Sequence, residues 1–243
     1  MPVLRDCAIY YGGYDLTSTA NQIDFSASCA QVDVTTFAAA GNVTLAPGLK
    51  DGSANVTTFT DFSTSEAALK TDNVGTVQVL TAVGFPTGGT VTAGDRCYAI
   101  RGLLKSDKDA KKVGDAAMLD ASIMQAQAEG VLGGTVVLAP TAITASGTGT
   151  ILNLGAVAAG KSVYFGVHVI ASSGNRTITP VLQSAAAAGF GTPADRVTLG
   201  SMSAFGSSFG SSATATTDAY WRISYTTGGS SGSLTVVAFA AIQ

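Results

Sequence analysis

Short runs of alternating apolar and polar residues, separated by Gly, Asp and Asn, dominate the first half of the chain. This period of two predicts β-strands with one buried and one polar face. In residues 22–28, QIDFSAS, the apolar Ile23 and Phe25 stand between polar neighbours. Residues 7–16, CAIYYGGYDL, have the pattern of a strand, a Gly-Gly turn and a return strand. We therefore predict antiparallel strands from the start of the chain.

The tetrapeptide Val-Thr-Thr-Phe occurs twice, at residues 34–37 and 56–59, with almost no charge between the copies. Both copies lie in alternating segments that carry apolar groups on both faces. Such strands are expected in a sheet that is covered on both sides. Between them, Asp51-Gly52 predicts a tight turn.

One short helix is predicted, at residues 65–72 (SEAALKTD), because Ser63 and Glu66 have the spacing of a capping box. Residues 114–130 (GDAAMLDASIMQAQAEG) are ambiguous, since their composition favours a helix whereas their alternation favours a strand. We predict a strand there, because Gly114-Asp115 resembles a hairpin turn that follows residues 95–105.

The character of the chain changes around Gly133-Gly134, after which acidic and basic residues become rare. We place a domain boundary there, which gives domains 1–133 and 134–243. The second domain has strands at near-regular spacing, which predicts a β-sandwich of Ig-like or jelly-roll type. Trp221, in mid-strand, is expected to anchor its core. The Gly/Ser-rich residues 205–216 are interpreted as a flexible loop.

Composition makes the surface unusually neutral, because charged residues are 12% of the chain against about 25% in an average soluble protein. A surface with few charges is poorly protected against self-association. Burial in an assembly would explain this composition, and a small neutral secreted β protein is the alternative. The net charge of −3 argues against a nucleic-acid-binding surface. The basic residues between Arg101 and Lys112 alternate with acids and predict a solvated loop.

The sequence offers no support for catalytic, metal or cofactor chemistry, so we predict a protein that is not an enzyme. Cys7, Cys29 and Cys97 are odd in number and lack Cys-x-x-Cys spacing, and we expect buried thiols outside any disulfide. His168 is the only histidine and is predicted to be an ordinary strand residue. No apolar run reaches 18 residues and no signal peptide is evident, so membrane insertion is not expected.

The order of features in residues 1–133 resembles the major tail tube proteins of long-tailed, siphophage-like bacteriophages. The resemblance is carried by GGYDLTSTANQIDFSAS, DVTTF, GLKDGSANVTTFTDF and, later, KVGDAAMLDASI. It covers about half of the chain, and the order and spacing of these motifs are more specific than any one of them. The C-terminal half is similar to β-sandwich domains that are appended to such tail proteins and displayed on the outside of the virion.

This resemblance implies an all-β fold: a tail-tube-like sandwich or barrel with one short helix, followed by the C-terminal β-sandwich. It also implies that six copies form a ring, that their inner strands close into one barrel, and that rings stack into a tube in the virion tail. The partners would be other copies, other phage tail proteins and, transiently, DNA passing through the lumen. Subunits would be made in the cytoplasm of the bacterial host.

Seven residues become candidates for these roles. A lumen that does not retain DNA should be neutral or acidic, and the sequence leaves open which strand face is inward. The candidate lumen acids are Asp24, Asp33 and Asp61, and the candidate inter-subunit strand residues are Val34, Phe37, Val56 and Phe59.

Another reading is a minor tail or head-decoration protein whose C-terminal sandwich binds cell-surface glycans. Exposed aromatic residues such as Tyr164 or Tyr220 would serve as the binding platform. Copy number per particle distinguishes this reading from the major tube protein.

Overall fold

The computed structural model describes residues 6–35, 43, 45–61, 63–70, 73–85, 89–110 and 116–243. In this part of the chain the protein consists of antiparallel strands and one short helix, which confirms the predicted all-β fold. No helix among the described residues is long and apolar enough to cross a membrane.

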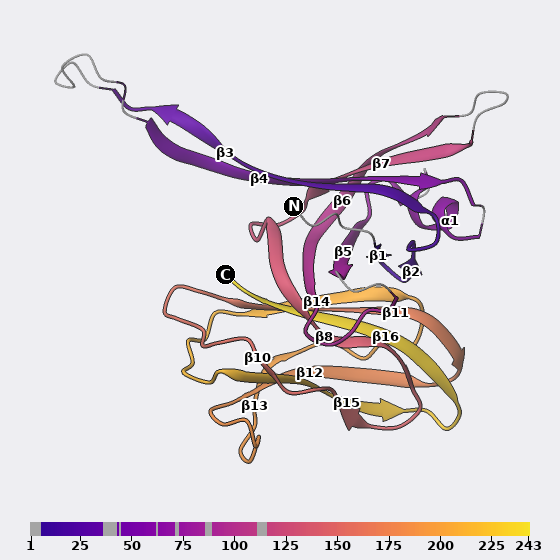
Figure 1. Ribbon diagram of the computed structural model, residues 1–243, viewed down its shortest axis with the longest axis vertical. Helices are drawn as coiled ribbons and strands as arrows, with labels where there is room; N and C mark the ends of the chain where they lie inside the picture. The colour runs from indigo at the N-terminus through magenta and orange to yellow at the C-terminus, as the bar shows by residue number, and fades with distance from the viewer. Residues whose placement is uncertain are drawn as a thin grey trace.

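The strands and the helix follow in chain order (Figure 1). The first half contains β1 (Asp6–Tyr11), β2 (Tyr14–Asp15), β3 (Ala20–Asp33), β4 (Leu45–Phe59), α1 (Ser65–Leu69), β5 (Val77–Phe85), β6 (Arg96–Ala110) and β7 (Met118–Gln125). The second contains β8 (Val131–Ile143), β9 (Gly147–Thr148), β10 (Leu152–Asn153), β11 (Val163–Gly174), β12 (Thr177–Ala185), β13 (Ala194–Thr198), β14 (Gly206–Ser212), β15 (Tyr220–Gly228) and β16 (Gly232–Ile242).

A large sheet of 11 strands runs through both halves of the chain in the order β14-β11-β16-β8-β6-β5-β1-β2. The long strand β6 is its branch point, because its first part pairs with β5 and β8 whereas Gly102–Ala110 pairs with β7. Strand β4 then pairs with β7, and β3 with β4. A second sheet contains β10, β15, β12 and β13, with β9 beside β15.

Three apolar cores separate the layers of the molecule. The first lies between the two sheets of the C-terminal sandwich and includes Trp221, Phe165 and Ile223. Trp221 is fully buried and its Nε1 donates to the Gly155 carbonyl at 2.8 Å, which confirms its predicted role as a core anchor. Burial of such a large side chain contributes strongly to the stability of a small sandwich.

The other two cores lie on opposite faces of β1, β5 and β6. On one face, the side chains of these strands pack against Val237 and Phe239 of β16, and we call this contact the seam. On the other face, β3, β4, β7 and α1 cover a core that includes Leu80 and Ile100. The sandwich and the β3–β4–β7 layer therefore lie on opposite sides of the central strands (Figure 1).

The predicted Gly-Gly turn at residues 12–13 is present between β1 and β2. The predicted turn at Asp51-Gly52 is wrong, because both residues lie inside β4. A Cβ atom at Gly52 would lie 2.9 Å from Gln125 Oε1 and 3.2 Å from the Val131 nitrogen. A glycine is needed here for close packing rather than for a turn.

The short helix is present as α1, but the predicted capping box is wrong. Its N-cap residue, Thr64, makes no side-chain capping bond. The backbone and hydroxyl of Ser63 instead donate to Asp61 Oδ1 at 3.0 and 2.9 Å. The Glu66 carboxylate pairs with Lys70 one turn later, so it does not reach back to the cap.

Three further segments, residues 105–110, 114–130 and 205–216, all contain strands in the structure. The predicted strand in residues 114–130 is confirmed as β7, while the turn at Gly114-Asp115 lies outside the described residues. Residues 105–110, predicted as part of a loop, continue β6. The predicted flexible loop at 205–216 is also wrong, because Gly206–Ser212 forms β14 against β11. Small residues suit that strand, since a Cβ at Gly210 would lie 2.8 Å from Leu199.

The predicted domain boundary at 133/134 falls inside β8. The beginning of β8, Val131–Thr135, pairs with β6, and the strand from Thr135 onwards pairs with β16. The two sequence-defined domains therefore share one strand. The prediction of buried thiols is correct for Cys97 and wrong for Cys29, which is exposed on β3, whereas Cys7 is partly buried.

Candidate assembly surface

Four antiparallel strands, β3, β4, β7 and the far part of β6, lie side by side on the side of the molecule away from the sandwich (Figure 1). Their register aligns Asp24 with Asn55, Asn55 with Ser122, and Ser122 with Ser106. Alternate residues point inward: Ala54, Val56, Leu119, Ala121 and Ile123 are buried in the core below.

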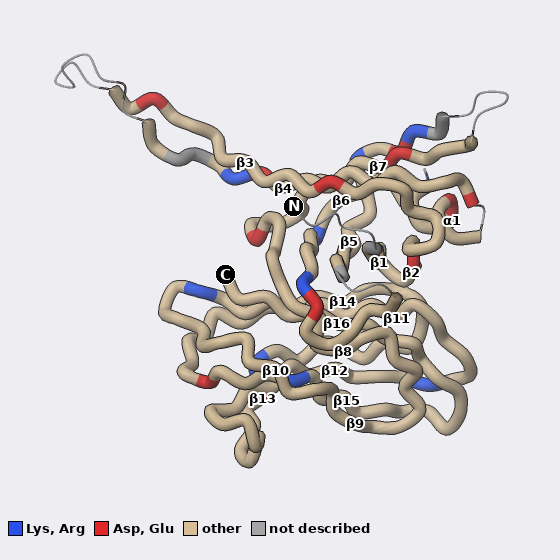
Figure 2. The backbone as a smooth tube through the Cα atoms, viewed as in Figure 1, with Lys and Arg blue, Asp and Glu red and all other residues tan. Residues whose placement is uncertain are grey.

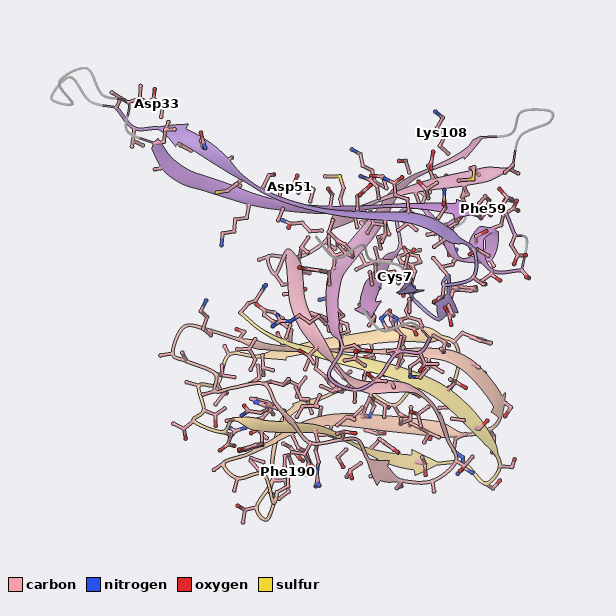
Figure 3. All side chains as sticks on the ribbon, viewed as in Figure 1. Cys7, Asp33, Asp51, Phe59, Lys108 and Phe190 are labelled. Atoms are coloured by element: carbon pink, nitrogen blue, oxygen red, sulfur yellow. The ribbon has the colours of Figure 1, made fainter. Side chains whose placement is uncertain are left out.

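The outward side of these four strands is almost entirely polar, and we call it the polar face. It consists of Gln22, Asp24 and Ser26 on β3, Asp51, Ser53, Asn55 and Thr57 on β4, Asp120, Ser122 and Met124 on β7, and Ser106 and Lys108 on β6. Its side chains bond to one another, since Gln22 Nε2 donates to Asp24 at 2.6 Å and Thr57 Oγ1 donates to Asp120 at 2.7 Å. Its acids outnumber its single lysine, Lys108, which projects away from the sandwich in Figure 3.

Both edges of this four-stranded layer lack a strand partner among the described residues. Strand β3 pairs with β4 alone. On β6, pairing with β5 ends at Leu103, and from Lys105 to Ala110 the strand pairs only with β7. Unpaired backbone N–H and C=O groups at a sheet edge are a template for pairing with another chain.

The hairpin of β3 and β4 extends beyond the rest of the layer, and we call residues 27–33 and 45–52 the arm. Strand β7 accompanies β4 only along Ser53–Phe59, so the arm has just two strands. It projects from one end of the molecule (Figure 1). Leu49, Leu45 and Val32 are 86%, 50% and 48% exposed. A two-stranded ribbon with exposed apolar side chains is at best marginally stable in water.

The three candidate lumen acids lie in different surroundings. Asp24 is on the polar face. Asp33 ends β3 at the tip of the arm, where hydrogen bonds from Thr35 lower the pKa of its carboxyl group. Asp61 lies before α1, and hydrogen bonds from Ser63 and Thr64 lower the pKa of that carboxyl group. Asp61 therefore organises the start of the helix and is not part of the polar face.

Sequence reasoning did not single out Asp51 and Asp120, which share the polar face with Asp24. The alternation of residues 51–57 and 118–124 contained the signal, because Asp51 and Asp120 stand on the same side as Ser, Thr and Asn neighbours. The interpretation of Asp51-Gly52 as a turn concealed that signal at β4.

The candidate inter-subunit residues also divide. Val34 and Phe59 are 46% and 45% exposed, and Phe59 follows Thr57 on the outward side of β4. Val56 is a correction: it is fully buried in the core under the polar face and has no area left for a partner. Phe37 lies outside the described residues.

His168 lies at the seam and serves the fold. Its Nδ1 atom is 2.8 Å from the Gly12 carbonyl, and its Nε2 atom is 2.8 Å from Thr81 Oγ1. Because a carbonyl can only accept, Nδ1 carries the proton and Nε2 accepts from the threonine. Burial lowers the pKa of His168 to about 4, so the imidazole is neutral at pH 7. Among the described residues, no group of three or more His, Cys, Asp or Glu could hold a metal ion.

The two tyrosines considered for glycan binding are not exposed platforms. The ring of Tyr164 packs at the seam, with its centroid 6.1 Å from that of Phe209. Tyr220 is half-buried at the start of β15. Both side chains are therefore partly buried rather than fully exposed.

Comparison with known proteins gives no family assignment: no family model and no curated protein matches the chain. Among solved structures, a protein from the virion of a native gene transfer agent particle matches with 19% identity and a TM-score of 0.41, over 52% of this chain and 95% of that chain. A protein of the sheath-tube complex of an extracellular contractile injection system matches with 15% identity and a TM-score of 0.39, over 56% and 92%.

The Dit protein of phage SPP1, a hub protein of the adsorption apparatus, matches with 10% identity and a TM-score of 0.35, over 98% of this chain and 100% of that chain. All three TM-scores are below 0.5. These likenesses therefore carry no weight in what we propose about the function.

Proposed function

We propose that this chain is a structural protein of a bacteriophage-type virion, the major tail tube subunit. Its copies form hexameric rings that stack into a DNA-conducting tube, and its C-terminal sandwich lies on the tube exterior. The observation that carries this proposal is the four-stranded antiparallel layer with two unpaired edges and one polar face. The motifs of residues 1–133 that resemble tail tube proteins support it independently.

The number of strands in the layer suits a closed ring. Because the layer is antiparallel and has four strands, β3 and β6 at its two edges run in opposite directions. Rotation about a ring axis brings the β6 edge of one copy beside the β3 edge of the next, where the strands are again antiparallel. Repeating this contact pairs every edge and leaves none exposed to aggregate.

Charge favours one register of this contact. Along Lys105–Ala110 the β6 edge carries Lys105 and Lys108, which alternate with Asp107 and Asp109, and the facing β3 edge would place Asp24 beside a lysine. Opposite charges on facing edges favour one register of pairing over others. Association at this edge is expected to weaken at high salt, since these side chains are exposed.

The polar face would line the lumen. It lies on the opposite side of the layer from the core, and the sandwich lies beyond that core (Figure 1). A ring that turns the polar face inward places the sandwich outside. Three acids and one lysine, Lys108, give the face a net negative charge (Figure 2). Such a surface repels DNA phosphates and lets DNA pass without being retained.

Cysteine cross-linking tests the ring contact. Cysteines replacing Ser26 on β3 and Ser106 on β6 should form disulfides between copies, with products up to the hexamer on non-reducing gels. A matched control replaces Asn55 and Ser122, which are cross-strand partners within one copy. That pair should form an intramolecular bond only. Both variants carry Cys29→Ser, because Cys29 is exposed on the same strand.

Electron microscopy of the same protein distinguishes a major tail tube subunit from a minor tail protein. Tubes of stacked rings at high protein concentration are the expected result. A protein that stays strictly monomeric when concentrated, and that is absent from the shaft of its virion, would exclude the tube role. A single ring per particle would instead identify a minor tail protein.

A further inference from the structure

A cleft of about 710 Å³ separates the arm from the sandwich. One wall is the arm at Cys29 and Lys50, and the other is the sandwich at Lys161 and Tyr164. Its floor is the β7–β8 connection, which includes Glu129. The arm, which forms one wall of the cleft, projects from one end of the molecule (Figure 1).

The arm is the unsupported wall of this cleft. Beyond Ser53 it has no third strand, and Leu49 is 86% exposed. The sandwich wall, in contrast, is fixed to the central strands through the seam. The arm is tied to the rest of the chain near its base, where Gln125 Nε2 donates to the Lys50 carbonyl at 2.9 Å. Farther out, β3 and β4 pair with each other and not with a third described strand.

We propose that this cleft receives the opposite end of a second copy of this chain, supplied by the next ring of the stack. This inference rests on the proposed function. Strands of a closed barrel run from one rim of the ring to the other at a tilt. Because the arm continues β3 and β4 past the rest of the layer, it overhangs the rim of its own ring. Rings that repeat along an axis bring this rim against the opposite rim of the next ring.

Charge complementarity identifies the part of the second copy that enters. Lys50 and Lys161, both exposed, line the cleft. The opposite end of the molecule, around β2 and α1, carries the exposed Asp15 and the partly exposed Asp61. Glu129 on the floor is 3.8 Å from Arg101, which offsets its negative charge. Asp51 also lines the cleft, but alternation along β4 turns its side chain to the polar face. The side chains of Lys50 and Lys161 would therefore meet an end that carries Asp15 and Asp61.

Charge reversal tests this contact. The double variant Lys50→Glu, Lys161→Glu should still form rings, but tubes should be lost or shortened at least tenfold in electron micrographs. Adding Asp15→Lys to the same chain should restore part of the tube length. A matched control, Thr226→Glu, adds negative charge on the second sheet of the sandwich, away from the cleft, and should leave tube length unchanged.

A covalent readout complements the charge test. Asp15→Cys should form a disulfide with Cys29 of a copy in the next ring, and Cys29→Ser should abolish it. Asp195→Cys, on the far sheet of the sandwich, should give no such product.

The outcomes separate the two proposals. Wild-type protein that forms no rings would overturn the proposed function together with this inference. Wild-type tubes accompanied by unchanged tubes in the lysine double variant would overturn this inference alone. Monomeric double variant would place the lysines in the contact within a ring and would also overturn it.

Discussion

The Nε2 atom of His168 lies 2.8 Å from Oγ1 of Thr81, in a buried hydrogen bond between residues 87 positions apart. The bond joins β11 of the sandwich to β5 of the central strands. Both side chains are only 1% exposed. A buried polar pair at the seam is stable only when both partners are satisfied, and here the Gly12 carbonyl completes the set. The sandwich is thus attached to the central strands by these buried hydrogen bonds as well as by apolar packing.

This pair predicts acid sensitivity in a defined pH range. Burial lowers the pKa of His168 to about 4, from 6.5 in an exposed histidine, so the unfolded chain binds a proton more readily than the folded one. Stability from this group is complete above about pH 6.5 and is lost as pH falls toward 4. The loss should reach about 3 kcal/mol. Urea unfolding measured from pH 7 to pH 4 checks this expectation.

The variant His168→Gln provides the control for that titration. Glutamine can donate and accept hydrogen bonds but does not titrate, so the pH slope between 6.5 and 4 should disappear. His168 is the only histidine in the chain, so no second imidazole can mask the effect. An unchanged slope in the variant would show that carboxyl groups dominate the acid response.

Gly13, in the turn between β1 and β2, lies close to the backbone at the start of β14. A Cβ atom there would lie 2.3 Å from the Gly206 nitrogen, which is backbone and cannot rotate away. Gly13→Ala should destabilise the protein by about 1–3 kcal/mol or more. Gly133→Ala is the matched control, because its Cβ would meet no atom nearer than 3.9 Å. Equal melting temperatures for the two variants would contradict this account.

The two sequence-defined domains should not fold separately. Division at 133/134 cuts β8 and exposes Val79, Val83 and Leu132, which Val237 and Phe239 help to cover in the intact chain. Residues 1–133 alone should therefore bind a dye for apolar surfaces and unfold without a sharp transition. Calorimetry and dye fluorescence on this fragment test the expectation. A sharp, reversible unfolding transition would establish the predicted boundary instead.

Local patterns predicted the strands well where alternation was strong. Ile23 and Phe25 revealed β3, and Leu119, Ala121 and Ile123 revealed β7 against a composition that favours helix. The misinterpreted segments depend on tertiary contacts. Gly52 and Gly210 lie inside strands, and glycine is required at both positions because neighbouring atoms leave no room for a Cβ atom. No local pattern distinguishes such a glycine from one in a turn or loop.

The candidate surface could be predicted only in part for a related reason. Alternation placed Asp24 on a polar strand face, but only strand pairing brings Asp51 and Asp120 onto that same face. Asp61 resembled them in sequence and lies elsewhere, because it stands beyond the end of β4. The register between strands is a long-range property, which the order of residues in one strand does not contain.

The charge of the polar face provides the most direct prediction about DNA passage. Asp24→Lys with Asp51→Lys should make the proposed lumen basic while leaving the core below it unchanged, since both side chains are exposed. Tubes of this variant should retain double-stranded DNA, and retention should fall about a thousandfold or more between 50 and 200 mM salt. Asp195→Lys, on the far sheet of the sandwich, is the matched control and should not retain DNA in the channel. Filter binding measures how much double-stranded DNA each tube variant retains. Comparing tubes with open ends and tubes with capped ends separates DNA held in the channel from DNA held on the exterior. Equal retention by both variants would mean that the polar face does not line the channel, because the phosphates would then meet the exterior charge as readily as the proposed lumen charge.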